Sequence, residues 1–254
     1  MLRHFLRFIA LVVIVFCFSC APKTPEEFDN EKALYEYGLK LFNDKSYSDA
    51  AKFFESFKNR YPTSQLISEA EFNLAESYYK KGDYIEAVYS FQNFIYLHPT
   101  NPKVPTALYR IALSYHKQMP STIDRDQSDT RNCINTINDL LARYPDFEEA
   151  QKAKDILTQC LRTLAKREMY IADFYLNQRS YKAALGRLET VKQDYKFKDL
   201  KQEATYKLAL SYHKLHERDK AIENLNELLS MNPDNEYKNK ANKLIAKLSQ
   251  KKDK

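Results

Sequence analysis

Glycine and tryptophan are scarce in this chain, and each scarcity argues against a kind of structure. Only 3 of the 254 residues are glycine, which leaves little room for hairpin turns between strands or for loops that cradle phosphate. Tryptophan is absent, whereas tyrosine and phenylalanine number 19 and 15. The sequence has no nucleophile elbow, no HExxH zinc motif and no carboxylate pair that stands apart from the solvated charges. These absences predict a helical protein that is not an enzyme.

Charge of one sign is not concentrated anywhere along the chain. Lysine and arginine total 40 and aspartate and glutamate total 34, which gives a formal net charge of +6. Because the two signs are interspersed, the chain has no basic stripe of the kind that nucleic-acid binding requires. We therefore expect no nucleic-acid partner.

Long apolar runs are also scarce, and the longest one lies near the start of the chain. Residues 8–18 are all apolar, but a span of the bilayer needs about 20 such residues. Arg3 and Arg7 precede the run, and a small residue follows it. This order is typical of an export signal. Residues 1–19 are therefore expected to be a lipoprotein signal peptide.

The residue after this signal is a cysteine, and the pair Ser19-Cys20 resembles a bacterial lipobox. In such a box the thiol receives diacylglycerol, the chain is cut before it, and the new amino group takes an acyl chain. Cys17 departs from the pattern, because leucine is usual at that position. We expect covalent lipid on Cys20 and a tether over residues 20–30. The alternative is an ordinary secretory cut that leaves Cys20 as a plain thiol.

Residues 68–101 contain the unit that the rest of the chain repeats. Two short helices are expected there, joined by a turn at Gly82, since glycine adopts positive φ without steric cost. In a frame of about 34 residues, the small and apolar residues match the tetratricopeptide repeat, or TPR. The matching residues are Leu74, Ala75, Tyr78, Gly82, Ala87, Phe91, Phe94 and Pro99.

The same pattern recurs along the chain and predicts an all-α fold, a TPR solenoid of about five helix-turn-helix repeats with a C-terminal capping helix. Direct internal evidence is IALSYHK at residues 111–117, which LALSYHK nearly duplicates at residues 208–214. Repeat 1 is expected over residues 31–64, repeat 2 over 68–101, repeat 3 from 105, repeat 4 from the end of a long helix over 148–177, and repeat 5 over 202–235.

Three features depart from a regular array. Repeat 3 carries a polar insertion, MPSTIDRDQSD, which is expected to form a long loop. The stretch 148–177 lacks proline and glycine, so it predicts one long helix. A final amphipathic helix over 236–248 is expected to cap the array. We divide the folded part into residues 31–146, with repeats 1 to 3, and residues 147–254, with the long helix, repeats 4 and 5 and the cap.

Cysteines and histidines give only weak signals for a metal or a disulfide. His213 and His216 are three residues apart on a predicted helix, but His116 occupies the same repeat position as His213, so shared ancestry explains the pair better. No metal site is expected. Cys133 stands where the repeat frame requires a small buried residue. Burial as a small apolar side chain is the simpler interpretation of Cys133 and Cys160, and a disulfide is the alternative.

The order of these features resembles one family, the BamD lipoproteins of the outer-membrane β-barrel assembly machine. Along the chain these features are a lipobox, a short tether, five TPRs, a polar insertion in the third TPR and a long helix that opens the fourth. Local matches are residues 60–62 (RYP), 98–102 (HPTNP), 124–126 (DRD) and 143–145 (RYP). Lys196 departs from the pattern, because proline is expected at that position.

The resemblance implies a non-enzymatic scaffold on the periplasmic face of the outer membrane, held to the bilayer by its acyl anchor and without a further cofactor. The family binds the POTRA domains of the barrel protein BamA. It also helps to deliver unfolded outer-membrane proteins, whose C-terminal strands end in an aromatic residue. Arg187 matches an arginine through which the family contacts BamA.

The repeat frame itself predicts a binding groove, because fixed positions of each first helix line the concave face of a TPR array. The residues at these positions are mostly aromatic, which suits an extended apolar peptide. They are Tyr35, Leu39, Phe42, Phe72, Glu76, Tyr79, Tyr109, Leu113 and His116. The alternative is that several of them only pack between helices.

Two other functions remain open at this stage. One is a generic periplasmic TPR scaffold lipoprotein that coordinates cell-envelope or peptidoglycan work. The other is a glycan-binding lipoprotein, although the absence of tryptophan argues against it. Recovery of BamA, as opposed to peptidoglycan enzymes, in a pull-down from membranes would distinguish the assembly role from the scaffold role.

Overall fold

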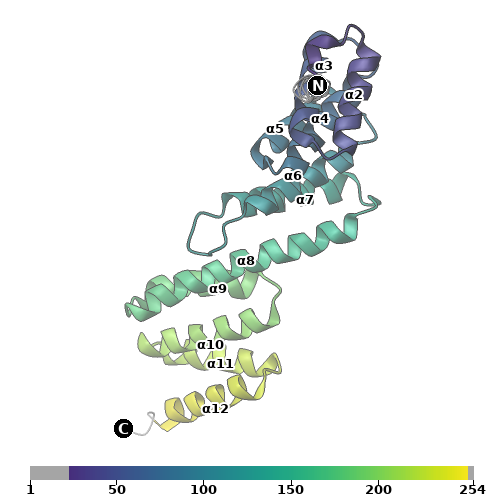
Figure 1. The fold of residues 1–254 in the computed structure, drawn as a ribbon. Helices are drawn as coiled ribbons and strands as arrows, with labels where there is room; N and C mark the ends of the chain where they lie inside the picture. Colours follow the sequence, from purple (N-terminus) through teal and green to yellow (C-terminus); the bar gives the residue numbers. More distant parts are fainter. Residues whose placement is uncertain (1–22, 251–254) are drawn as a thin grey trace, which may run out of the picture. The chain divides into compact units, whose positions relative to one another are not determined.

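The computed structural model describes residues 23–250, and that range is built from helices (Figure 1). It contains one 3-10 turn, η2 (Pro25–Glu27), and the α-helices α2 to α12. No strand occurs in the described range. This confirms the prediction of an all-α TPR fold. No helix among the described residues combines the length and the apolar character that crossing a membrane requires.

The chain divides into two compact units, the first ending at Val104 and the second beginning at Pro105. In the first unit, α2 (Glu31–Asn43) packs on α3 (Tyr47–Arg60), and α4 (Ile67–Lys81) packs on α5 (Tyr84–Leu97). The helix α3 also packs on α4. These two helix pairs are repeats 1 and 2.

The second unit continues the pairing from helix to helix. Its elements are α6 (Val104–Gln118), α7 (Ser128–Arg143), α8 (Ala150–Asn177), α9 (Tyr181–Asp194), α10 (Lys198–Lys214), α11 (Arg218–Ser230) and α12 (Asn235–Gln250). From α7 onward, each helix packs on the next. The 28 residues of α8 confirm the predicted long helix. The helix α12 covers α11 with Ala241, Leu244 and Leu248, as expected of a cap.

Small residues let the two helices of each pair approach closely. Each helix pair has a small residue at the repeat positions of Ala75 and Ala87, and every alanine there is 0% exposed. Gly38 shows how tight this contact is, since a Cβ built there would lie 3.0 Å from Cε1 of Phe54. Large side chains then fill the space on either side of the contact, among them Phe54, Phe57, Phe91 and Phe94, all 0% exposed.

The turn between paired helices uses the left-handed conformation. Gly82 has φ of 95°, as the sequence predicts. Lys45, Arg179 and His216 occupy the same repeat position and adopt φ of 63°, 59° and 63°. The turn geometry is therefore kept where the sequence has no glycine, although a side chain in this conformation costs about 1–2 kcal/mol.

The segment predicted as a tether is folded from Pro25 onward. The ring of Phe28 lies 5.0 Å from that of Tyr37 and 5.5 Å from that of Phe53, measured between centroids. The Arg60 guanidinium donates hydrogen bonds to the carbonyl oxygens of Pro25 at 2.9 Å and Phe28 at 2.6 Å. The arginine of the first RYP motif therefore fastens the entry of the chain to the end of α3. Proline disfavours an α-helix here, but it does not prevent this short turn.

Alanine substitutions at two glycines should change stability in opposite directions. Gly82→Ala places a Cβ on a left-handed residue and should cost about 1 kcal/mol. Gly186 lies inside α9, where a Cβ would meet no atom within 4 Å. Gly186→Ala should therefore add about 0.5–1 kcal/mol, because alanine favours the helix. Thermal melting of both variants measures the effect, and shifts of the same sign would contradict the role of the left-handed turn.

Candidate functional site

The first unit places the predicted groove residues on α2 and α4, but not all of them are accessible. Tyr35, Leu39, Phe42 and Tyr79 are half-buried. Phe72 and Glu76 are only 8% and 6% exposed. The first group keeps surface that a ligand could contact, whereas the second is largely enclosed by the fold.

Phe72 packs between helices in this conformation. Its ring lies 5.6 Å from that of Phe91 and 5.3 Å from that of Phe94, both in edge-to-face geometry. The ammonium group of Lys103 lies 4.8 Å from the same ring. Phe72 thus joins α4 to α5, and little of it remains for a peptide.

Tyr35 combines an apolar body with a polar tip. Its hydroxyl oxygen accepts a hydrogen bond of 3.1 Å from Nδ2 of Asn73. Burial, together with the charge of Glu69, raises the pKa of Tyr35. The hydroxyl therefore stays neutral and able to hydrogen-bond at physiological pH.

The second unit holds the other three predicted groove residues on α6. Tyr109 is 6% exposed, and its ring lies 5.7 Å from that of Phe147, between α7 and α8. Burial, together with the charge of Glu149, raises the pKa of Tyr109. Leu113 and His116 are half-buried. A peptide-binding role for all nine groove residues stays a prediction.

The HPTNP junction after repeat 2 has a packing role that the sequence does not indicate. Nε2 of His98 lies 2.6 Å from Oε2 of Glu71, whose side chain is only 8% exposed. Lys103 forms an ion pair with Glu69 on the same helix, α4. His98 and Lys103, the residue after the motif, therefore tie the segment after α5 back to α4.

Arg187, the predicted partner-binding residue, lies on α9 and is already paired within the chain. Its Nη1 lies 3.0 Å from Oε2 of Glu168 on α8. The arginine side chain is 46% exposed and the glutamate 18%. Burial, together with the charge of Glu168, also raises the pKa of the nearby Tyr195. The ion pair holds the guanidinium in place while leaving about half of the side chain at the surface.

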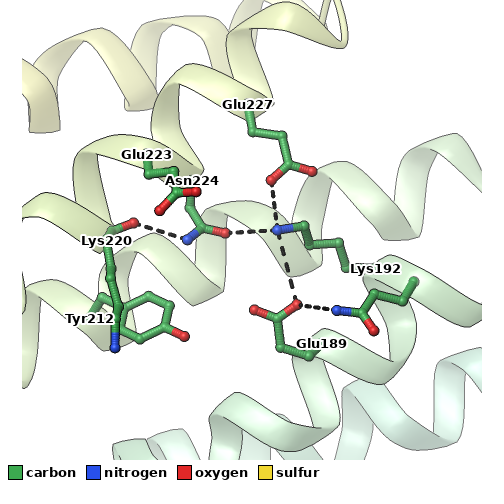
Figure 2. Close-up of a pocket in the computed structure, with 8 residues that line it drawn as sticks. Glu189, Lys192, Tyr212, Lys220, Glu223, Asn224 and Glu227 are labelled. Atoms are coloured by element: carbon green, nitrogen blue, oxygen red, sulfur yellow. Dashed lines mark hydrogen bonds and ion pairs between the residues drawn. The ribbon is translucent and has the colours of Figure 1, made fainter.

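A polar cleft of about 330 Å³ lies among α9, α10 and α11, and the sequence analysis does not identify it. Figure 2 shows Lys192 at its centre. The ammonium group lies 2.6 Å from Oε2 of Glu227, 3.1 Å from Oδ1 of Asn224 and 4.0 Å from Oε2 of Glu189. The Lys192 side chain thus links α9 to α11. The remaining lining residues are Gln193, Tyr212, Lys220 and Glu223.

The first unit has a smaller cavity at the equivalent place, about 20 Å³ in volume. Lys58 lines it from the repeat position that Lys192 occupies in the second unit, and Ser90 and Asn93 stand at the positions of Asn224 and Glu227. The recurrence of a lysine at one repeat position is the sequence signal that could have located both cavities.

Large apolar side chains also remain exposed on α5. Ile85, Tyr89 and Tyr96 are 71%, 72% and 82% exposed, at spacings that place them along one side of the helix. On α8, Tyr170 and Phe174 are about half exposed. The sequence analysis assigns no role to either set.

The described residues offer no cluster of three or more histidine, cysteine, aspartate or glutamate side chains that could hold a metal ion. Cys133 and Cys160 are free and buried. Cys20 lies outside the described residues. The paired helices place the chain in the class of helical TPR-repeat proteins.

Comparison with known proteins gives the family within this class. The family model YfiO, described as "Outer membrane lipoprotein", matches residues 28–221. The chain therefore belongs to the YfiO family of outer-membrane lipoproteins. The sequence resemblance to the BamD lipoproteins is thereby confirmed.

Individual relatives agree with this family. Outer membrane protein assembly factor BamD of Rickettsia prowazekii is 31% identical over 188 residues, which is 74% of each chain. The factor of the same name from Neisseria meningitidis is 25% identical over 191 residues, 72% of each chain. Among solved structures, the TPR domain of P58(IPK) aligns with 87% of this chain and 57% of that one, at 17% identity and a TM-score of 0.45.

Proposed function

We propose that this chain is a lipid-anchored, non-enzymatic assembly factor on the periplasmic face of the outer membrane. It binds the POTRA domains of a BamA-like barrel protein and the C-terminal segments of unfolded outer-membrane proteins. The observation that carries the proposal is the family match over residues 28–221, which covers most of the helix pairs. Relatives named as assembly factors support the same role.

The anchor in this proposal is diacylglycerol and an N-acyl chain on Cys20. Three peptide steps separate Cys20 from Lys23, so the two residues lie within about 11 Å of each other. The chain is fastened to α3 from Pro25 onward. The acylated end therefore holds the start of repeat 1 close to the bilayer surface.

Removal of the anchor should release the protein. Cys20→Ala should move the exported chain from the membrane fraction to the soluble fraction, because stable attachment depends on the acyl chains. Cys17→Leu, which brings the lipobox closer to the usual pattern, should stay in the membrane fraction. Fractionation and intact mass measure both effects. A wild-type mass without added lipid would show that Cys20 is a plain thiol.

Contact with the barrel protein is assigned to Arg187. A guanidinium can bind a carboxylate through two parallel hydrogen bonds, which lysine cannot imitate. The ion pair with Glu168 fixes the side chain before a partner arrives, which lowers the entropy cost of binding. An acidic side chain on a POTRA domain is the matching group.

Charge reversal at this position should uncouple the partner. Arg187→Glu should lower the BamA-like protein recovered in a membrane pull-down about tenfold or more, since like charges that face each other across an interface cost several kcal/mol. Glu168→Gln is the matched control, because it removes the internal ion pair and keeps the guanidinium. Equal recovery with Arg187→Glu and wild type, at unchanged melting temperature, would remove this role. Recovery of peptidoglycan enzymes in place of the barrel protein would favour a general envelope scaffold.

Peptide binding is assigned to the groove residues that keep accessible surface. On α2 and α4 these are Tyr35, Leu39, Phe42 and Tyr79. An extended client strand presents alternate side chains to one face, so half-buried apolar side chains can receive them while tyrosine hydroxyls meet the backbone. Burial of one aromatic side chain contributes roughly 1.5–3 kcal/mol, and ordering the peptide offsets much of that gain.

The test uses a labelled peptide that ends in an aromatic residue, as client strands do. Wild type should bind it with micromolar affinity, near −8 kcal/mol, and Phe42→Ala and Tyr79→Ala should each weaken binding about tenfold. Tyr96→Ala is the matched control, because Tyr96 is 82% exposed on α5 and lies outside the predicted groove. Equal affinity for wild type and both folded groove variants would exclude these residues as the peptide site.

A further inference from the structure

Three sulfur atoms meet inside the second unit, at a place that the proposed function does not use. Cys133 belongs to α7, Cys160 belongs to α8, and Met119 follows α6. Both cysteines are 0% exposed. The Cys160 thiol donates to the thioether sulfur of Met119 at 3.6 Å. Cys133 and Cys160 lie equally far from the facing ends of α7 and α8, two consecutive helices that pack on each other, so they stand at the same level of this helix pair.

The repeat frame gives no packing reason for a thiol at this position. Cys133 stands where the other repeats have Ala50, Ala87, Ala184 and Ala221, each 0% exposed. Alanine therefore satisfies the close approach of paired helices. Cys160 lies in the first half of α8, which precedes the part that pairs with α9 as a repeat. The second thiol thus comes from the segment that is additional to the regular array.

We propose that Cys133 and Cys160 form a disulfide that joins α7 to α8 in the exported protein. The helices α7 and α8 already pack on each other and enclose both side chains. A disulfide is neutral and weakly polar, so it suits a site with no exposed surface better than bound Cu⁺ would, since Cu⁺ between two thiolates leaves a net negative charge buried.

The reaction is a thiol–disulfide exchange with the disulfide of an oxidant, such as a periplasmic oxidoreductase or oxidised glutathione. A thiolate of this chain attacks the oxidant's disulfide and releases one oxidant thiolate. The second thiolate of this chain then displaces the other. Two protein thiols are thereby oxidised, and the oxidant's disulfide is reduced to two thiols.

The neighbouring Cys160, together with burial, raises the pKa of the Cys133 thiol, so this thiol stays protonated and unreactive while the helices are packed. Because neither thiol is exposed, the exchange requires α7 and α8 to be apart, either before they pack or during local opening.

The proposal rests on export of the chain to an oxidising compartment. The experiment tests separately whether the chain is exported and whether Cys133 and Cys160 lie close enough to bond. The full chain isolated from membranes should take up no maleimide at these two cysteines when denatured, and should take up two after reduction. Its intact mass should rise by two hydrogens on reduction. A chain produced without its signal should be reduced in the cell and should form the same bond with oxidised glutathione in vitro. If the bond forms with oxidised glutathione but is absent from the chain isolated from membranes, the result counts against export. If the bond does not form with oxidised glutathione, the disulfide is overturned.

Two variants complete the test. Cys133→Ala introduces the residue of the other repeats, so the chain should fold, label once with or without reductant, and melt roughly 5–10 °C below oxidised wild type, as reduced wild type should. Met119→Leu should leave the disulfide intact. Copper bound in proportion to the chain, lost on Met119→Leu, would overturn the disulfide in favour of a soft-metal site.

Discussion

The close approach of two helices within each repeat is the contact on which the rest of the structure depends. Alanine at the repeat positions of Ala75 and Ala87 is 0% exposed in repeat after repeat. In repeat 1, Gly38 takes the place of the first of these alanines and lies against the ring of Phe54. With the helix axes this close, the next positions along each second helix point into the core beside that helix pair. Phe54, Phe91, Leu188 and Leu225 occupy the same repeat position and are all 0% exposed.

Most of the fold can be predicted from the sequence because this contact leaves a periodic signature. The helix pairs, the long α8 and the cap α12 all follow from small and apolar residues at fixed spacing. The folded entry could not be predicted in this way, because it depends on Arg60 reaching carbonyl oxygens far away in the sequence. The left-handed turns at Lys45, Arg179 and His216 were missed for a related reason, since local propensity disfavours them and the paired helices impose them.

The candidate site is less predictable than the fold. An averaged repeat frame assigns Phe72 and Tyr109 to the groove, yet both are almost fully buried against other rings. The frame fixes which side of a helix a residue occupies, but the size of neighbouring side chains decides how much of it stays exposed. Charged contacts between helices, such as that of Lys192 with Glu227, are equally hard to foresee, because one long side chain can reach several partners.

The left-handed turns also bear on the order in which the chain folds. In a repeat protein, folding can begin in any repeat and spread to its neighbours. Repeats 1, 4 and 5 must place a lysine, an arginine or a histidine in the left-handed conformation, whereas repeat 2 has Gly82 there. Repeat 3 must close a long polar loop, which adds an entropic barrier. Repeat 2 therefore forms its turn with the least backbone strain, so its helix pair meets the lowest local barrier of this kind.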